Sequence, residues 1–66
     1  MTLKDVIEKY DVTPYRVSKD GDIPYSTLNI VTRGDRDWKS LSFYNLEKIA
    51  AGIGIDVITL IRELEK

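Results

Sequence analysis

Apolar residues recur along this chain at the spacing of one face of an α-helix. In three segments they occupy positions i, i+3, i+4 and i+7, with charged residues between them. No segment shows the two-residue alternation of a half-buried strand, so the pattern predicts an all-α fold. The three apolar stripes are Leu3, Val6, Ile7 and Tyr10; Leu46, Ile49, Ala50 and Ile53; and Val57, Leu60, Ile61 and Leu64.

Polar residues that can cap a helix stand directly before each of these segments. Thr2, Ser42 and Asp56 are the predicted N-caps, because their side-chain oxygens can accept a backbone N–H of the first turn. Asp11 ends the first segment, and Gly54 ends the one that begins after Ser42. These signals predict three helices, which begin after Thr2, Ser42 and Asp56. Two further helices, described next, are predicted between the first and the second of them.

Another helix is predicted to begin at Thr13, because the next residue is Pro14, which suits the first helical position. The helix is short, since residues 20–22 (Asp-Gly-Asp) are typical of a turn. Val17 and Tyr15 are expected to face the interior.

Pro24 predicts the start of a third helix, because its ring disfavours helical geometry at the residue before it. This helix is expected over about residues 24–32. Leu28 and Val31, three positions apart, form its buried side, and Gly34 ends it.

A polar loop is predicted over residues 34–41, with Trp38 and Leu41 folding back on the core. The aromatic residues have the spacing of helix faces, so we interpret them as residues of the core or its edge rather than a platform for stacked bases. They are Tyr10, Tyr15, Trp38, Phe43 and Tyr44.

The chain has 66 residues, which suffices for one small domain spanning residues 1–66. It contains no Cys and no His, which excludes disulfides, thiolate zinc sites and acid–base catalysis by histidine. No nucleophile–base pair or phosphate-binding glycine loop is visible, so we expect no catalytic residue, no metal and no cofactor. No signal-peptide pattern or membrane-spanning apolar run is present, so a cytoplasmic protein is expected.

The formal net charge is −1, from ten basic and eleven acidic residues. A protein that binds duplex DNA usually has a basic surface, and the total charge therefore counts against DNA binding. Between residues 14 and 40, however, five basic residues face four acidic ones, so this segment is net positive while the remainder is net negative.

The order of these elements resembles the lambda-repressor/Cro-like regulators, also called the xenobiotic-response-element (XRE) type. The resemblance covers nearly the whole chain and includes the later segments 46–55 and 56–64. Within its centre, Pro14 replaces a common Gln, Asp22 replaces a common turn Gly, and Ile30 fills a slot that is often polar. The matching central residues are Val12-Thr13-Pro14, Val17-Ser18, Asp22-Ile23, Pro24-Tyr25-Ser26-Thr27-Leu28 and Val31-Thr32-Arg33-Gly34.

The resemblance implies a five-helix lambda-repressor-like domain in which the second and third helices form a helix-turn-helix. It also implies a transcriptional regulator of prokaryotic or phage type, with repression as the expected action, that places residues 24–32 in the major groove of duplex DNA. The residue types suit base reading, because hydroxyl and amide groups can bond to base edges and an apolar group can contact a thymine methyl. The candidate base readers are Tyr25, Ser26, Asn29 and Ile30.

Basic residues near the motif are candidates for contacts with phosphates, because non-specific affinity requires several neutralised phosphates. Arg33, Arg36 and Lys39 lie in and after the end of the third helix, and Arg16 and Lys19 could flank its other side. The alternative for each is an ordinary solvated charge.

The third helix alone would contact too few bases for tight, specific binding to DNA, so a homodimer is expected. Its candidate surface is the fifth helix, through Val57, Ile58, Ile61 and Leu64; the alternative is that these residues close the core. The rival function is a protein-interaction module, such as an antirepressor or adaptor, on the same fold without DNA binding. The acidic balance, the missing Gln and the apolar Ile30 favour that rival.

Overall fold

The computed structural model describes residues 1–66 and contains five α-helices, one short 3₁₀ helix and no strand. The prediction of an all-α chain with five helices is confirmed. The helices are α1 (Leu3–Lys9), α2 (Pro14–Gly21), α3 (Tyr25–Thr32), α4 (Phe43–Ile53) and α5 (Val57–Leu64), with η1 (Trp38–Ser40) between α3 and α4.

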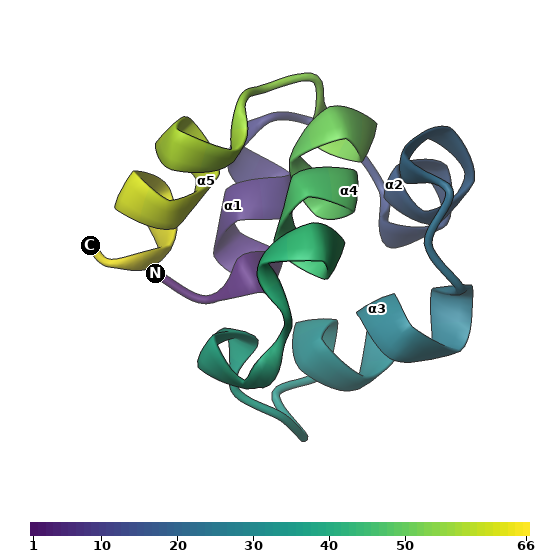
Figure 1. The fold of residues 1–66 in the computed structure, drawn as a ribbon, viewed down its shortest axis with the longest axis horizontal. Coiled ribbons are helices and arrows are strands. Elements are labelled where there is room, and N and C mark those ends of the chain that lie inside the picture. Colours follow the sequence, from purple (N-terminus) through teal and green to yellow (C-terminus); the bar gives the residue numbers. More distant parts are fainter.

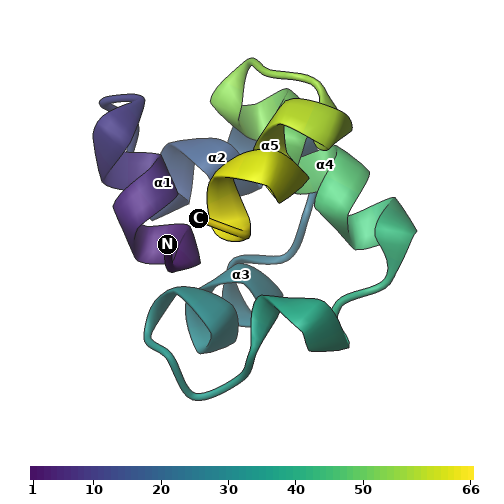
Figure 2. The ribbon, with the colours of Figure 1, turned by 90° about the vertical axis from the view of Figure 1, so that its left-hand side faces the viewer.

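The helices surround α4, as Figure 1 shows. α2 packs along α4 and also contacts α3, while α5 packs against α4 and α1. α3 and the η1 loop lie together at the lower edge of the molecule in Figures 1 and 2. α3 is therefore a peripheral helix that is held in place by α2 and α1.

A single core of thirteen buried residues joins all five helices. The predicted apolar stripes supply most of it, and Tyr10, Val57 and Ile61 lie partly buried at its edge. The core consists of Leu3, Val6, Ile7, Val17, Ile23, Leu28, Val31, Leu46, Ile49, Ala50, Ile53, Leu60 and Leu64.

The predicted N-caps are all present. The hydroxyl of Thr2 accepts the backbone N–H of Asp5, whose carboxylate accepts the N–H of Thr2 in return, each at 3.1 Å. The side chains of Thr13 and Ser42 each accept an N–H of their own first turn at 3.2 Å, and Asp56 does so at 2.7 Å. These bonds fix where α1, α2, α4 and α5 begin.

Two glycines allow α2 and α4 to pack closely. A Cβ atom on Gly21 would lie 2.2 Å from the carbonyl oxygen of Lys48, and one on Gly52 would lie 2.4 Å from that of Val17. Gly21 is the last residue of α2 rather than part of the turn that the sequence predicted. Because Gly21 has no side chain, the backbone of α4 can lie directly against it.

One carboxylate, that of Glu63 on α5, is buried and forms ion pairs with Lys9 of α1 and Lys66. The Lys66 Nζ lies 2.8 Å from its Oε1. Hydrogen bonds from Lys66 and then Lys9 hold the pKa of Glu63 below its usual value, and the bond to Glu63 raises the pKa of Lys9. This cluster fastens α1 to α5.

Three aromatic residues were predicted wrongly. Tyr15, Phe43 and Tyr44 have exposed fractions of 67%, 54% and 65%. Tyr15 lies two residues from the buried Val17, which places it on nearly the opposite side of α2. Phe43 and Tyr44 form the first turn of α4, before the buried stripe begins at Leu46. Tyr10 and Trp38 pack against the core, as expected.

Candidate nucleic-acid interface

The connection between α2 and α3 consists of three residues with defined backbone geometry. Asp22 is left-handed, with φ 56° and ψ 45°, and caps α2; Pro24 has φ −56° and ψ 134° and caps α3. Ile23 between them is buried and donates its N–H to the carbonyl of Ser18 at 3.1 Å. The hydroxyl of Ser18 donates to the carbonyl of Ile23 at 2.7 Å. The angle between the two helices is thus fixed by hydrogen bonds and by burial of Ile23.

The third helix was expected over about residues 24–32; α3 begins at Tyr25, with Pro24 just before its first helical residue. The left-handed residue of the turn is Asp22. Aspartate adopts the left-handed region more readily than most residues with a side chain, so the absence of glycine at residue 22 is compatible with the turn.

One side of α3 is buried and the other faces solvent. Leu28 is fully buried and Val31 nearly so, and no other helix covers the lower side of α3 in Figure 1. The candidate residues of α3 fall within an arc of about 140° on the helix, at 3.6 residues per turn. Asn29 is half-buried and the other four are exposed; together they are Tyr25, Ser26, Asn29, Ile30 and Arg33.

α3 has the dimensions that a groove would accept. With side chains an α-helix is about 10–12 Å across, which fits the major groove of about 12 Å. The side chains at its N-terminal end, Tyr25 and Ser26, form no hydrogen bond within the chain, and their hydroxyl groups are free to bond to a partner.

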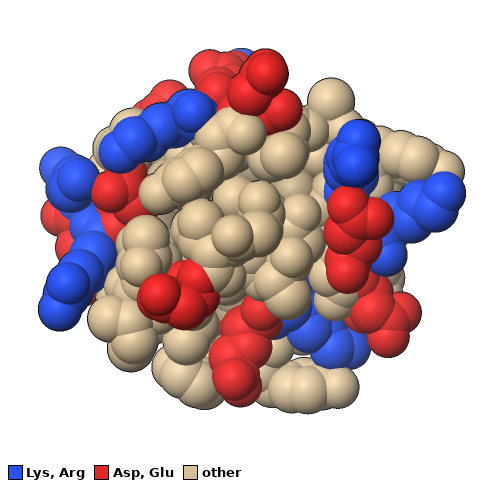
Figure 3. All heavy atoms as spheres, turned by 90° about the horizontal axis from the view of Figure 1, so that it is seen from above, with Lys and Arg blue, Asp and Glu red and all other residues tan.

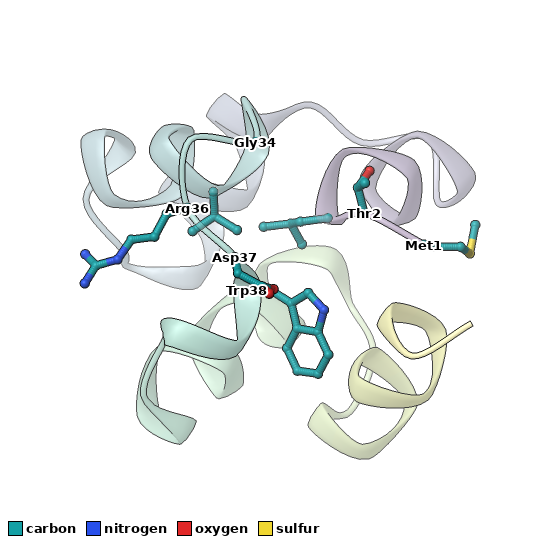
Figure 4. A pocket seen from close by; sticks show the side chains of 8 residues that line it. Met1, Thr2, Gly34, Arg36, Asp37 and Trp38 are labelled. Atoms are coloured by element: carbon teal, nitrogen blue, oxygen red, sulfur yellow. The ribbon is translucent and has the colours of Figure 1, made fainter.

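The loop after α3 is held in one conformation. Gly34, with φ 85°, ends the helix, and Asp37 accepts the N–H of Lys39 at 3.2 Å. The partly buried Trp38 anchors the loop on the core, as predicted. Together with the first residues of the chain the loop borders an open cavity of about 380 Å³, shown in Figure 4, where the Arg36 guanidinium points away from Trp38.

The five candidate cations differ in what they contact. The Arg16 guanidinium pairs with Asp20 at 3.3 Å, and Arg33 pairs with Asp35. Lys19, Arg36 and Lys39 are exposed and form no ion pair. Three cations near the motif are therefore available without breaking an existing pair.

The cations of α2 border a depression on their own helix. Arg16 and Lys19 border a shallow depression of about 240 Å³ whose other lining residues, Tyr15 and Asp20, also belong to α2. The structure thus gathers the candidates of α3 on one helix side, with Arg36 and Lys39 on the loop that follows it. Arg16 and Lys19 lie on α2, the helix that precedes α3.

Figure 3 shows the end of the molecule that is opposite to α3. Acidic and basic side chains are mixed around its margin, and its centre is uncharged. No concentrated basic surface lies on that end.

The predicted dimer surface on α5 needs one correction. Leu64, with an exposed fraction of 4%, belongs to the core, as does Leu60. Ile58 is 53% exposed, and Val57 and Ile61 are partly buried. α5 therefore closes the core with one side, as the alternative interpretation held for Leu64, and presents Ile58 on the other side, where the dimer surface stays a prediction.

Lys48 was not among the predicted residues, although it contacts the turn of the motif. Its Nζ donates to the carbonyl of Asp22 at 3.1 Å and lies 4.5 Å from the centre of the Tyr44 ring. The two partners in the hydrogen bond are 26 residues apart. No local sequence pattern could have indicated the contact.

No group of three Asp or Glu residues is placed to hold a metal ion. None of the helices has the length and apolar character needed to cross a membrane.

Comparison of the chain with protein-family models, with curated proteins and with solved structures finds no match in any of the three. The likeness to lambda-repressor/Cro-like regulators therefore remains a prediction from the residues quoted above.

Proposed function

We propose that this protein is a lambda-repressor-like regulator that binds duplex DNA sequence-specifically through α3, with α2 and α3 as its helix-turn-helix. The observation that carries the proposal is the division of α3 into two sides. Leu28 and Val31 anchor one side in the core, while the other carries the exposed side chains of Tyr25, Ser26 and Ile30 and the half-buried amide of Asn29.

The exposed side of α3 offers chemistry that can distinguish base pairs. The Asn29 amide can bond to N6 and N7 of an adenine in a bidentate manner, which discriminates by about 1–3 kcal/mol. The hydroxyl of Ser26 can bond to a base or a phosphate, and Ile30 can contact a thymine methyl. Lys19, Arg36 and Lys39 would neutralise phosphates and set the orientation of the domain.

Two kinds of substitution test the proposal on duplexes selected for binding from a random pool. Ser26→Ala and Asn29→Ala are expected to lower the affinity by about 1–3 kcal/mol for the selected sequence and to relax the preference at one base position. Arg36→Ala is expected to weaken binding to all duplexes alike. It is also expected to reduce the slope of log affinity against log salt by about one.

Arg62→Ala is the matched control, because Arg62 is an exposed cation on α5, which packs against α1 and α4. It is expected to leave the sequence preference unchanged. If the substitutions on α3 and Arg36→Ala had the same effect on every duplex, the assignment of base readers would be wrong.

The rival function, a protein-interaction module on the same fold, is favoured by the exposed apolar side chains. Tyr25 and Ile30 on α3 have exposed fractions of 47% and 37%, and Phe43 and Tyr44 begin α4 exposed. A contiguous apolar surface is typical of a protein interface. This function predicts that Ile30→Lys abolishes binding to a protein partner, whereas a DNA-binding protein would keep or gain non-specific affinity for duplexes.

The proposed homodimer uses the outer side of α5. Ile58 is its central residue, with the partly buried Val57 and Ile61 beside it. Ile58→Glu is expected to shift the protein toward the monomer in sedimentation equilibrium without changing its helical circular dichroism. A variant that dimerises as well as the original chain would exclude α5 as the interface.

A further inference from the structure

Lys48 of α4 contacts the turn between α2 and α3 through both its side chain and its main chain. The Nζ donates a hydrogen bond of 3.1 Å to the carbonyl of Asp22, the left-handed residue of the turn. The Lys48 carbonyl oxygen lies against Gly21, at a position where a Cβ atom would be 2.2 Å away. One residue of α4 thus contacts two successive residues at the end of α2.

The Lys48 side chain has a fixed direction. Its Nζ lies 4.5 Å from the centre of the Tyr44 ring, one helical turn earlier on α4. An ammonium group over an aromatic face is attracted to it. The ring and the Asp22 carbonyl therefore hold the same ammonium group, and Tyr44 has a structural reason to stay at the surface.

The carbonyl of Asp22 has no backbone partner, so Lys48 is the group of the chain that satisfies it. Only Ile23 and Pro24 separate this carbonyl from the first residue of α3. A displacement of Asp22 would consequently move Tyr25 and Ser26, the N-terminal end of the exposed side of α3.

We propose that Lys48 is a positioning residue that sets the orientation of α3 relative to the core, and thereby the affinity for DNA. The consequence for DNA rests on the proposed function, whereas the effect on the turn does not. On this proposal the Lys48 ammonium acts on the turn rather than on a phosphate, since its contacts are the Asp22 carbonyl and the Tyr44 ring.

The first test compares Lys48→Met, which keeps the apolar stem and removes the donor, with Lys48→Arg, which retains a cationic donor. Lys48→Met is expected to weaken binding to duplex DNA about tenfold, the lower end of what a charge-assisted hydrogen bond contributes. Lys48→Arg is expected to restore most of the affinity. Unchanged affinity in Lys48→Met would overturn the proposal.

The salt dependence of the affinity for DNA shows whether Lys48 acts by positioning α3 or by contacting a phosphate directly. Lys48→Met is expected to keep the slope of log affinity against log salt, because no phosphate contact is lost. A slope smaller by about one would show that Lys48 binds a phosphate and would overturn the proposal. Arg62→Met, which removes one positive charge from α5, controls for the change in net charge.

Amide hydrogen exchange in the protein without DNA measures whether Lys48 stabilises the turn between α2 and α3. Lys48→Met is expected to accelerate exchange at the Ile23 amide, which bonds to Ser18, about tenfold more than at the amides of α5. Equal acceleration in both places, or none at Ile23, would overturn the proposal. If the wild-type chain bound no DNA, the proposed function would fail while this exchange experiment would still decide the role of Lys48.

Discussion

Gly21 and Asp22 are neighbours that meet different structural requirements. Gly21 is helical and lacks a side chain because the backbone of α4 occupies that space, whereas Asp22 carries the left-handed conformation of the turn. The sequence Asp-Gly-Asp predicted a turn over residues 20–22, but Asp20 and Gly21 are still helical and the turn begins at Asp22. The sequence could not assign these two roles, because the assignment depends on Lys48, which is distant along the chain.

Glu63 gives the molecule a defined dependence on pH. Hydrogen bonds from Lys66 and Lys9 lower its pKa below the ordinary 4.5, so its ionised form stabilises the folded chain. That stabilisation is complete above the unfolded pKa of about 4.5 and is lost as the pH falls through the lower, folded value. Glu63→Gln is therefore expected to lower the midpoint of urea denaturation at pH 7, with a difference from wild type that shrinks below pH 4.

The same pair is weakened at high pH, where Lys9, whose pKa is raised above 10.5, loses its proton. Glu65→Gln is the matched control, since Glu65 is exposed and forms no ion pair. A denaturation difference for Glu63→Gln that stayed constant from pH 7 to pH 3 would show that the ion pairs do not stabilise the fold.

At the scale of elements, the sequence predicted the helices well because their determinants are local. The caps at Thr2, Thr13, Ser42 and Asp56 are all formed, and the apolar stripes face the core. The errors concern which side chains are buried and which are exposed. Tyr15 was expected inside, although its place two residues from Val17 puts it on the outer side of α2. For Leu64 the sequence left a dimer surface and closure of the core both open, and the packing of α5 on α1 and α4 puts it in the core.

The close packing of α2 on α4 can be tested at Gly52, where an added Cβ would meet the carbonyl of Val17 at 2.4 Å. Gly52→Ala is expected to lower the free energy of unfolding by about 1–3 kcal/mol, even though alanine favours the helix. Thermal and urea denaturation measure the change. Ala51→Ser, on the exposed side of the same helix, is expected to change stability by less than about 0.5 kcal/mol. A Gly52→Ala variant as stable as wild type would show that α2 and α4 are not packed this closely.

At the scale of the whole molecule, the sequence predicted which helix carries the candidate site. It did not predict which of the charged residues near that helix are paired with one another. The pattern around Pro24 indicated a short helix with one free side, and the structure has one. The ion pairs of Arg16 with Asp20 and of Arg33 with Asp35 are local in sequence, so the spacing of four residues on a helix could have indicated the first of them. The net charge is −1, and Lys19, Arg36 and Lys39, which form no ion pair, are the cations to which we attribute the proposed affinity for DNA.

The central claim, that this chain binds duplex DNA, is tested most directly by titrating mixed-sequence duplex at several salt concentrations. If Lys19, Arg36 and Lys39 each neutralise one phosphate, the log of the association constant should fall with log salt with a slope of about −3 per chain. Replacing all three by methionine should abolish the dependence, whereas Arg62→Met should preserve it. No affinity at low salt, or an affinity that does not change with salt, would contradict the account.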